Sequence, residues 1–258
     1  MAAPKMFDLS GTVAIVTGGN GGIGRGIALG LAEAGAAVAI LARNREKNRA
    51  VAAELEALSV RAIALEADLS DRTQLKPALE RVERDLGAVN ILVNNAGIAV
   101  MSPTLTLEPA DWDSVIETNL TSCFILSRLA AQSMVARKAA NTIGKIINVA
   151  SEYAFFGAPA VPSYSAAKGG LMQLTKSMAI ELARHNIQVN AIVPGWIETA
   201  MTEPLKSVPL YDEILMRTPA RRFGRPEECA GAAVFLASHA SDFVTGSAVF
   251  VDGGYRIR

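Results

Sequence analysis

A tyrosine and a lysine four residues apart are the pair in this chain with the clearest capacity for chemistry. Tyr164 and Lys168 lie in the run SYSAAKG, and Ser151 precedes them. A free phenol titrates near pH ~10, so it exchanges protons at neutral pH only where a nearby cation favours the phenolate. Residues four apart share a helix face, which puts the Lys168 ammonium beside Tyr164. With a hydroxyl such as that of Ser151 to orient a substrate oxygen, the three residues predict an acid–base site. Such pairs also occur by chance in many chains, and the pair alone is more typical of a solvated helix face.

A glycine-rich stretch, TGGNGGIG, occupies residues 17–24 between a predicted strand at 12–16 and a predicted helix at 23–34. Glycine permits a tight turn and lets the backbone approach a ligand closely. The start of a helix offers free N–H groups and the positive end of its dipole to a phosphate. In this position the stretch predicts a dinucleotide site. The alternative is a turn whose glycines serve packing only.

The rest of the chain alternates short apolar runs with helical patterns. Strands are predicted at 12–16, 37–41, 61–65, 91–94, 145–149, 187–192 and 248–251, and helices at 23–34, 45–58, 74–85, 111–136, 164–184 and 226–237. This order predicts an α/β fold with a doubly wound, mostly parallel seven-stranded sheet of the Rossmann type. Because the strands are apolar throughout rather than alternating, we expect helices on both faces.

No linker or repeat divides the chain, so we expect a single dinucleotide-binding domain over residues 1–258. The stretch 194–226 holds five of the eleven prolines and shows little periodicity. Long irregular insertions of this kind are often lids, and we expect a substrate-binding lid over about residues 196–225. A plain surface loop is the alternative. Residues 138–143 are expected to form only a surface connection.

Composition excludes several classes of function. The 25 basic and 25 acidic residues balance, which argues against nucleic-acid or membrane-surface binding. No apolar run reaches the ~20 residues of a membrane span. The first ten residues include Asp8 and no apolar signal segment, so we expect a cytoplasmic protein. The two cysteines and two histidines are too widely spaced for a metal site, and neither histidine suits a Ser-His-Asp hydrolase.

The motifs taken together resemble the short-chain dehydrogenases/reductases through essentially the whole chain. The residues that carry the resemblance are Gly18, Gly22, Ile23 and Gly24 of the glycine stretch, Asn94, Asn95, Ala96 and Gly97, then Asn119, Ser151, Tyr164, Lys168, Pro194 and Gly195. The segment 144–190 is similar to that of gluconate and deoxygluconate dehydrogenases of the family. Family members are oxidoreductases, so the resemblance implies hydride transfer between a nicotinamide dinucleotide and a ketone or secondary alcohol.

The resemblance also implies a role for each motif residue. Tyr164 is expected to give or take the proton, and Ser151 to hold the reacting oxygen. Lys168 is expected to bind the nicotinamide ribose and to favour the Tyr164 phenolate. Asn119 is expected to shape its helix and to anchor a proton-relaying water, and the resemblance allows it at the same time to bond backbone as a buried helix asparagine. The implied cofactor residues are Gly18, Asn20, Gly22, Ile23, Gly24, Asp68, Leu69, Asn94, Ala96, Gly97, Tyr164, Lys168, Pro194, Gly195, Ile197 and Thr199.

The end of the second predicted strand bears on the choice of dinucleotide. An acidic residue there binds the ribose 2′-hydroxyl of NAD, whereas an arginine suits the 2′-phosphate of NADP. This chain has Ala42 at that position, followed by Arg43 and Asn44. We therefore predict NADP, with Arg43 on the 2′-phosphate and Asn44 assisting. The alternative is that Arg43 stacks over the adenine and NAD also serves.

The substrate is less constrained. The resemblance implies a small carbonyl or alcohol, such as a sugar acid or polyol, near Glu152, Tyr153, Trp196 and Met201. Glu152 is expected either to bond substrate hydroxyls or to be a solvent-facing rim charge. The arginines of the lid, Arg217, Arg221, Arg222 and Arg225, either meet a substrate carboxylate or hold the lid.

Two other functions remain open within the resemblance. One is a 3-oxoacyl thioester reductase of the fatty-acid type, and the other is a non-catalytic dinucleotide sensor. The intact glycine stretch and Lys168 argue against the halide-binding dehalogenases among the relatives. The resemblance further implies a homotetramer, with helices 111–136 and 164–184 on one dimer face and residues 251–255 on another.

Overall fold

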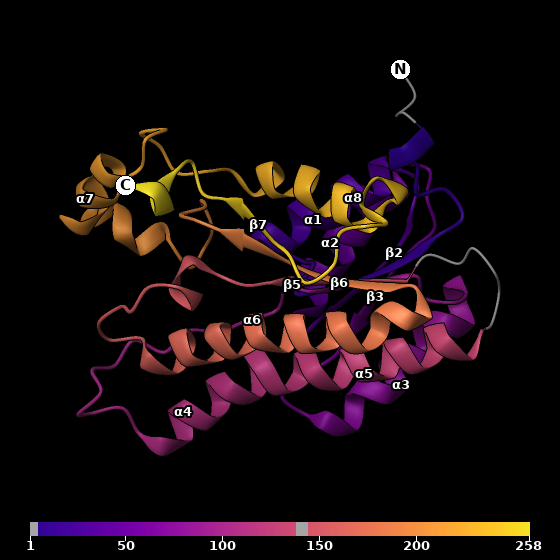
Figure 1. The fold of residues 1–258 in the computed structure, drawn as a ribbon, viewed down its shortest axis with the longest axis horizontal. Helices are drawn as coiled ribbons and strands as arrows, with labels where there is room; N and C mark the ends of the chain where they lie inside the picture. The colour runs from indigo at the N-terminus through magenta and orange to yellow at the C-terminus, as the bar shows by residue number, and fades with distance from the viewer. Residues whose placement is uncertain (1–4, 138–143) are drawn as a thin grey trace.

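A parallel sheet between two layers of helices forms the framework of the protein. The computed structural model describes residues 5–137 and 144–258, and Figure 1 shows the sheet edge-on between its helices. The strands are β1 Val13–Thr17, β2 Ala37–Ala42, β3 Ala62–Glu66, β4 Ile91–Asn94, β5 Gly144–Val149, β6 Ile187–Pro194 and β7 Ala248–Val251. They pair in the order β3-β2-β1-β4-β5-β6-β7, and all six pairs are parallel. The predicted fold class is confirmed, while the predicted connection at 138–143 lies outside the described residues.

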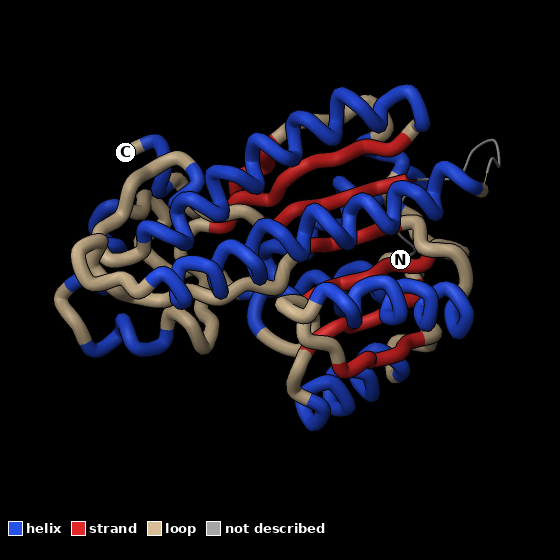
Figure 2. The backbone as a smooth tube through the Cα atoms, turned by 90° about the horizontal axis from the view of Figure 1, so that it is seen from below, coloured by secondary structure: helices blue, strands red, loops and turns tan. Residues whose placement is uncertain are grey.

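The helices divide between the two faces of the sheet. They are α1 Gly22–Glu33, α2 Arg45–Glu56, α3 Arg72–Leu86, α4 Pro109–Ile116, α5 Ser122–Ala136, α6 Pro162–Leu182, α7 Leu210–Arg217 and α8 Ala230–Ala237. Helices α1, α2 and α8 cover one face, and α3, α5 and α6 cover the other (Figures 1 and 2). Strand order reverses between β1 and β4, and ligands of open α/β sheets bind at the carboxyl ends of the strands beside such a reversal.

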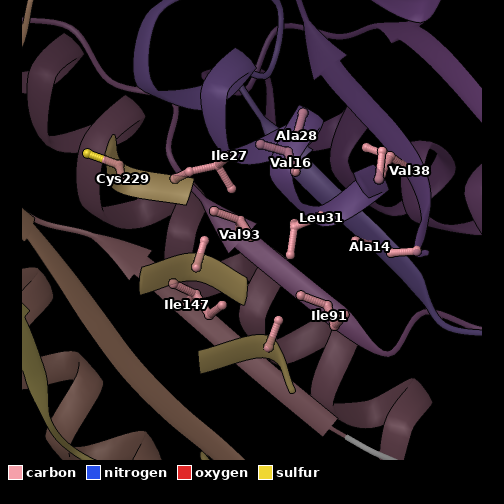
Figure 3. Close-up of a cluster of buried hydrophobic side chains, with 14 of the residues drawn as sticks. Ala14, Val16, Ile27, Ala28, Leu31, Val38, Ile91, Val93, Ile147 and Cys229 are labelled. Carbon is pink, nitrogen blue, oxygen red and sulfur yellow. The ribbon is translucent and has the colours of Figure 1, made fainter. Parts of the chain in front are cut away.

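Alternate side chains of each central strand supply two separate cores. Ala14 and Val16 of β1 pack against Ile27 and Leu31 of α1, as Figure 3 shows. Ile15, between them in sequence, belongs to the opposite core, which α3, α5 and α6 complete. Burying one large aliphatic side chain contributes about 1.5–3 kcal/mol. Both faces of the sheet are covered by helices, so polar side chains on either face of a strand would be buried away from water. This explains why the strands are apolar throughout.

A buried polar network joins β4 and β5 to the helices beneath the sheet. The side-chain amide of Asn94 donates to Ser127 Oγ and to Asn148 Oδ1, both at 2.8 Å. The amide of Asn148 donates in turn to Thr175 Oγ1 at 2.9 Å. All four side chains are buried. Strands β4 and β5 are thereby fixed to α5 and to α6, the helix that carries Tyr164 and Lys168.

The prediction of one continuous helix over residues 111–136 is wrong in the middle of this range. The segment runs as α4, then a wider π-helical turn at Glu117–Thr121, then α5. A single π turn leaves the apolar periodicity on either side almost unchanged, so periodicity does not reveal it. Asn119 lies within this turn.

The stretch 194–226 is more regular than expected. It contains a 3₁₀ turn at Glu203–Ser207 and helix α7. Pro204 stands in the first turn of the former, and Pro209 immediately precedes α7. Proline is tolerated at helix starts because the N–H that it lacks has no partner there. These prolines begin short helices within a stretch that was predicted to be irregular.

Removing the central member of the buried network should destabilise the fold more than trimming its edge. We expect Asn148→Ala to cost about 2–4 kcal/mol, because it opens a cavity and removes one hydrogen bond each from Asn94 and Thr175. Thr175→Val keeps the volume and should cost about 1 kcal/mol. Thermal melting at one protein concentration checks the order, and equal melting temperatures for the two variants would contradict it.

Candidate active site

A cavity of about 870 Å³ lies at the carboxyl edge of the sheet. Its walls come from the loops after β1, β2, β4, β5 and β6, together with the segment that carries α7. One end is lined by the glycine stretch and the other by Ser151, Tyr164 and Lys168. This edge is where a crevice is expected beside the reversal of strand order.

The glycine stretch is required by steric constraints at particular positions. Gly18 and Gly22 have positive φ values of 63° and 49°, a region that L side chains avoid. A Cβ on Gly24 would lie 2.3 Å from the carbonyl oxygen of Gly18, too close for any side chain. Helix α1 starts after Gly21 with no side chain capping it, so its first N–H groups are left for a ligand.

The loops after β1 and β4 are tied together by hydrogen bonds that the sequence analysis missed. Thr17 Oγ1 accepts from the backbone N–H groups of Asn95 and Ala96 at 2.9 and 3.0 Å. The Asn95 amide donates to the carbonyl oxygens of Thr17 and Gly18 at 2.9 and 3.3 Å. The sequence did contain a signal for these bonds, because the polar residues Thr17 and Asn95 stand at the ends of two buried strands. These bonds hold the glycine stretch against the loop that forms the middle of the cavity.

Tyr164 and Lys168 lie one turn apart near the start of α6. The Lys168 ammonium is 5.7 Å from the centroid of the Tyr164 ring and donates to the carbonyl oxygen of Val149, at the end of β5, at 2.6 Å. Only 3% of Lys168 is exposed, so this bond and the cavity set its position. Ser151 follows β5, and its Oγ accepts from the N–H of Tyr153 at 3.2 Å. The structure thus brings Ser151, Tyr164 and Lys168 into the lining of one cavity, with Tyr164 and Lys168 one turn apart as the helical spacing predicts.

Asn119 is fully buried behind this wall and does not line the cavity. Its side chain accepts from the N–H of Ile98 and donates to the carbonyl oxygen of Ile98, both at 2.8 Å. The expected description, a buried helix asparagine that bonds backbone, therefore fits its side chain. The π turn places this amide opposite the loop after β4. Gly97 lies between Asn119 and Lys168, because a Cβ on Gly97 would lie 3.3 Å from Asn119 Oδ1 and 3.7 Å from Lys168 Nζ.

Three polar side chains, two of them positively charged, line the cavity where β2 ends. Arg43, Asn44 and Lys47 all do so, and Ala42 contributes no carboxylate. Asn44 caps α2 by accepting from the N–H of Lys47 at 2.9 Å, which places Lys47 in the first turn. The sequence analysis missed Lys47, although the capping asparagine three residues earlier was a signal for its position.

The remaining predicted residues near this end have structural partners of their own. The Asn20 amide donates to Asn48 Oδ1 at 2.7 Å and so ties the glycine stretch to α2. Hydrogen bonds from Ser70 hold the pKa of Asp68 below its ordinary value, with the Arg43 charge adding to the effect. Asp68 is therefore ionised at neutral pH and faces Arg43.

Aromatic side chains form the opposite end of the cavity. The Tyr153 ring centroid lies 6.3 Å from that of Tyr164 and 6.0 Å from that of Trp196. Trp196 in turn lies 6.3 Å from Tyr255, which the sequence analysis missed because it stands near the chain end, away from every motif. Burial raises the pKa of Tyr153 to about 12, so its phenol stays neutral. Met201 lines this end as well and is 54% exposed.

Glu152 is buried beside the cavity, so its interpretation as a solvent-facing rim charge is wrong. Its exposed fraction is 4%, and neither carboxyl oxygen accepts a hydrogen bond. Burial raises the pKa of Glu152 to about 7, and the neighbouring carboxylate of Asp252 adds to the shift by repulsion and by accepting a hydrogen bond from the protonated form. Glu152 is thus a carboxyl group that exchanges its proton near neutral pH.

The four lid arginines separate into two groups. Arg222 forms a two-pronged ion pair with Glu228 at 2.6 and 2.7 Å, and Arg225 approaches the same carboxylate at 4.0 Å. Arg221 donates to the carbonyl oxygen of Met216 at 2.9 Å. These three do not line the cavity, whereas Arg217 does.

Comparison with known proteins gives full-length matches. A family model described as enoyl-(acyl carrier protein) reductase matches residues 18–256. The 2-dehydro-3-deoxy-D-gluconate 5-dehydrogenase of Formosa agariphila is 41% identical over 252 residues, 96% of this chain and 94% of the relative. Gluconate 5-dehydrogenase of Gluconobacter oxydans is 39% identical over 258 residues, 100% of this chain and 99% of the relative. The crystal structure of a gluconate 5-dehydrogenase from Burkholderia cenocepacia in complex with NADP and tartrate has a TM-score of 0.92 at 40% identity, covering 98% of each chain.

The chain belongs to the short-chain dehydrogenase/reductase family. The resemblance inferred from the motifs is confirmed, and the protein is an oxidoreductase. All but two of the residues predicted for its site line the one cavity. The exceptions are Asn119, described above, and Asn94. The Asn94 side chain points into the buried network between β4 and β5, so its expected place on the ribose side of the cofactor is not what the structure shows.

The raised pKa of Glu152 makes stability depend on pH. Between its ordinary value of 4.5 and about 7, the folded protein holds a proton that the unfolded chain has released. Stability therefore falls as pH rises through that range and stays lowered above it. We expect Glu152→Gln to raise the melting temperature at pH 8, by an amount that corresponds to about 1–3 kcal/mol, and to raise it much less at pH 5.

The matched control is Glu213→Gln, an exposed carboxyl on the same cavity. It should change the melting temperature little at either pH. An equal gain for Glu152→Gln at both pH values would contradict the assignment of a buried, proton-holding carboxyl.

Proposed function

We propose that the protein is an NADP-dependent oxidoreductase that interconverts a secondary alcohol and a ketone on a sugar acid. The observation that carries the proposal is the placing of Ser151, Tyr164 and Lys168 on one wall of a cavity whose other end holds the glycine stretch. A proton-transfer group and a dinucleotide phosphate site in the same cavity suit hydride transfer, which the family model and the full-length relatives also support.

The residues present fit a bound dinucleotide. The uncapped start of α1 and the side-chain-free glycines provide N–H groups and room for a pyrophosphate. Arg43 and Lys47 provide charge for a 2′-phosphate, and Ala42 offers no carboxylate to repel it. The Burkholderia relative was crystallised with NADP, which supports the same choice. NADP supplies or accepts the hydride when bound; the protein's own groups handle the proton and the position of the substrate.

Tyr164 is the proposed proton donor in reduction and acceptor in oxidation. The Lys168 ammonium near its ring stabilises negative charge on the phenol oxygen. The bond from Lys168 to Val149 fixes that ammonium at the end of β5, where it can also reach a ribose hydroxyl. Ser151 Oγ accepts from Tyr153, which leaves its proton free to donate to the substrate oxygen. Asn119 is a positioning residue, since it acts through Ile98 and Gly97.

A sugar acid is favoured over an acyl thioester. The full-length relatives are named for gluconate and a deoxygluconate derivative, and the Burkholderia structure holds tartrate, a small hydroxy acid. The proposed substrate end combines Tyr153 and Trp196 with the buried Glu152, which suits a ligand with hydroxyl groups. A dinucleotide sensor without catalysis would have no use for the assembled Ser151, Tyr164 and Lys168.

We further propose one domain over residues 1–258, with residues 196–225 as its substrate lid. Residues from both the glycine stretch and this segment line the same cavity, which supports the lid assignment. We also propose a homotetramer, because large apolar side chains are exposed on the two long helices, among them Phe124 at 45% and Ile180 at 81%.

The proposed compartment is the cytoplasm. Cys123 and Cys229 are both buried free thiols, which suits a reducing environment. Among the described residues, no helix is both long and apolar enough to cross a membrane.

Removing the phenol oxygen should stop turnover without preventing cofactor binding. We expect Tyr164→Phe to lower kcat by about 10³-fold or more, because the proton donor is lost while the ring and its packing remain. NADPH binding, measured by fluorescence titration, should change little. Near-normal kcat in this variant would contradict the assigned role. Loss of NADPH binding would show that the variant misfolds or that Tyr164 serves the cofactor alone.

Replacing the arginine at the end of β2 should change the cofactor preference. We expect the wild type to use NADPH with a higher kcat/KM than NADH. Arg43→Ala should lower kcat/KM for NADPH by about 10–100-fold and leave that for NADH nearly unchanged, because only NADPH has the phosphate. Lys47→Ala should have the same sign and a smaller size. Equal use of both cofactors by the wild type would refute the preference.

A further inference from the structure

Arg217 differs from the other lid arginines in what surrounds its charge. Its guanidinium carbon lies 4.3 Å from the centroid of the Tyr255 ring and 5.1 Å from that of Phe156. No carboxylate within the described residues forms an ion pair with it, whereas Arg222 and Arg225 share Glu228. Arg217 is also the only one of the four that lines the cavity.

The aromatic rings leave the N–H donors of the Arg217 guanidinium free. A guanidinium is planar, and rings stack on its faces by cation–π attraction. Its N–H groups point outward in the plane, where they match the two oxygens of a carboxylate. Phe156 and Tyr255 therefore restrict Arg217 without using its donors. A charge fixed in this way loses little further freedom when a ligand binds.

None of the nearby carboxyl groups in the described residues forms an ion pair with Arg217. Asp252 is occupied by backbone donors, since its two oxygens accept from the N–H groups of Gly254 and Arg256, each at 2.9 Å. Glu152 is buried with a proton that it releases only near neutral pH. Arg256, the other cation near Glu152, stacks on Phe155 and Phe250 and does not line the cavity. Among the described residues, Arg217 is therefore the guanidinium that lines this end of the cavity, beside the Lys168 ammonium at the catalytic wall.

We propose that Arg217 binds the carboxylate of the substrate and is the residue that selects acids over neutral sugars. This inference rests on the proposed sugar-acid function and assigns its specificity to one side chain. The carboxylate would sit against the Tyr255 side of the aromatic wall, with the reacting carbon at Tyr164.

The position of Arg217 also constrains where the reaction occurs on the substrate. No ring or ion contact joins Arg217 to Tyr164, but Tyr153 lies near both. Its ring centroid is 6.3 Å from that of Tyr164, and its phenol interacts electrostatically with Arg217. A ligand that touches both must extend along the Tyr153 side chain. This favours a carboxylate several carbons away from the reacting carbon over one directly beside it. Because Arg217 is the last residue of α7, the bound carboxylate also joins the substrate to the lid.

The test compares two substrates that differ only in the charged end. One is 5-keto-D-gluconate, and the other is L-sorbose, the ketose with the same carbon chain and a hydroxymethyl group in place of the carboxylate. Both are reduced with NADPH by the full-length wild type, Arg217→Met, Arg217→Lys and Arg222→Met. The readout is the ratio of kcat/KM for the acid to kcat/KM for the ketose.

We expect Arg217→Met to lower this ratio by about 10–100-fold, the value of a lost charge-assisted pair of hydrogen bonds. Arg217→Lys should recover part of it, since an ammonium supplies charge without the two-pronged geometry. Arg222→Met breaks the ion pair with Glu228 and should lower both rates without changing the ratio.

Two results would overturn the inference in different ways. If Arg217→Met lowers both rates equally, the residue only holds the lid, and the proposed function stands. If the wild type reduces an acyl thioester such as acetoacetyl-CoA and neither sugar compound, the proposed function fails, and the role of Arg217 fails with it.

Discussion

The parallel alignment of β1, β4 and β5 is the constraint on which the site depends. Because the three strands run in one direction, their carboxyl ends meet at the same edge of the sheet. The glycine stretch, the loop that ends at Gly97 and Ser151 each follow one of these ends. The hydrogen bonds of Thr17 and Asn95 then fix the first two loops against each other. Residues more than a hundred positions apart share one cavity for this reason.

Charge inside the site is controlled by burial and by single hydrogen bonds rather than by ion pairs. Lys168 is almost fully buried, and the carbonyl oxygen of Val149 is its hydrogen-bond partner. Glu152 has no donor for its oxygens and is held partly protonated by burial. Arg217 is restrained by rings rather than by a carboxylate. Such unpaired groups remain available to bind a ligand, whereas a charge already held in an ion pair is not available. The opposite case is Arg222, whose ion pair with Glu228 commits it to the lid.

The local sequence predicted the fold and the placing of Lys168 beside Tyr164 well, for physical reasons. Apolar runs alternating with helical patterns leave few arrangements other than a parallel sheet covered on both faces. Helical spacing alone brings Tyr164 and Lys168 to one face, and sterics alone require glycine at positions such as Gly24. The π turn around Asn119 was not predicted, because one wider turn shifts the phase of the apolar pattern but leaves the helical spacing on either side intact. The short helix α7 was missed because the proline-rich stretch around it shows little periodicity.

What the sequence by itself determined is the set of groups at the site: a tyrosine with a lysine one helical turn away, and a glycine stretch at the start of a helix. Each depends on neighbours in the chain, within a turn of a helix or a strand-to-helix connection. Only the tertiary structure decided the surroundings of Glu152 and Arg217. Burial, the approach of Asp252 and the rings of Phe156 and Tyr255 come from segments distant in sequence. The position of a charged residue in the sequence is the same whether its side chain is solvated or enclosed. The surroundings of Glu152 and Arg217 were therefore decided only by folding.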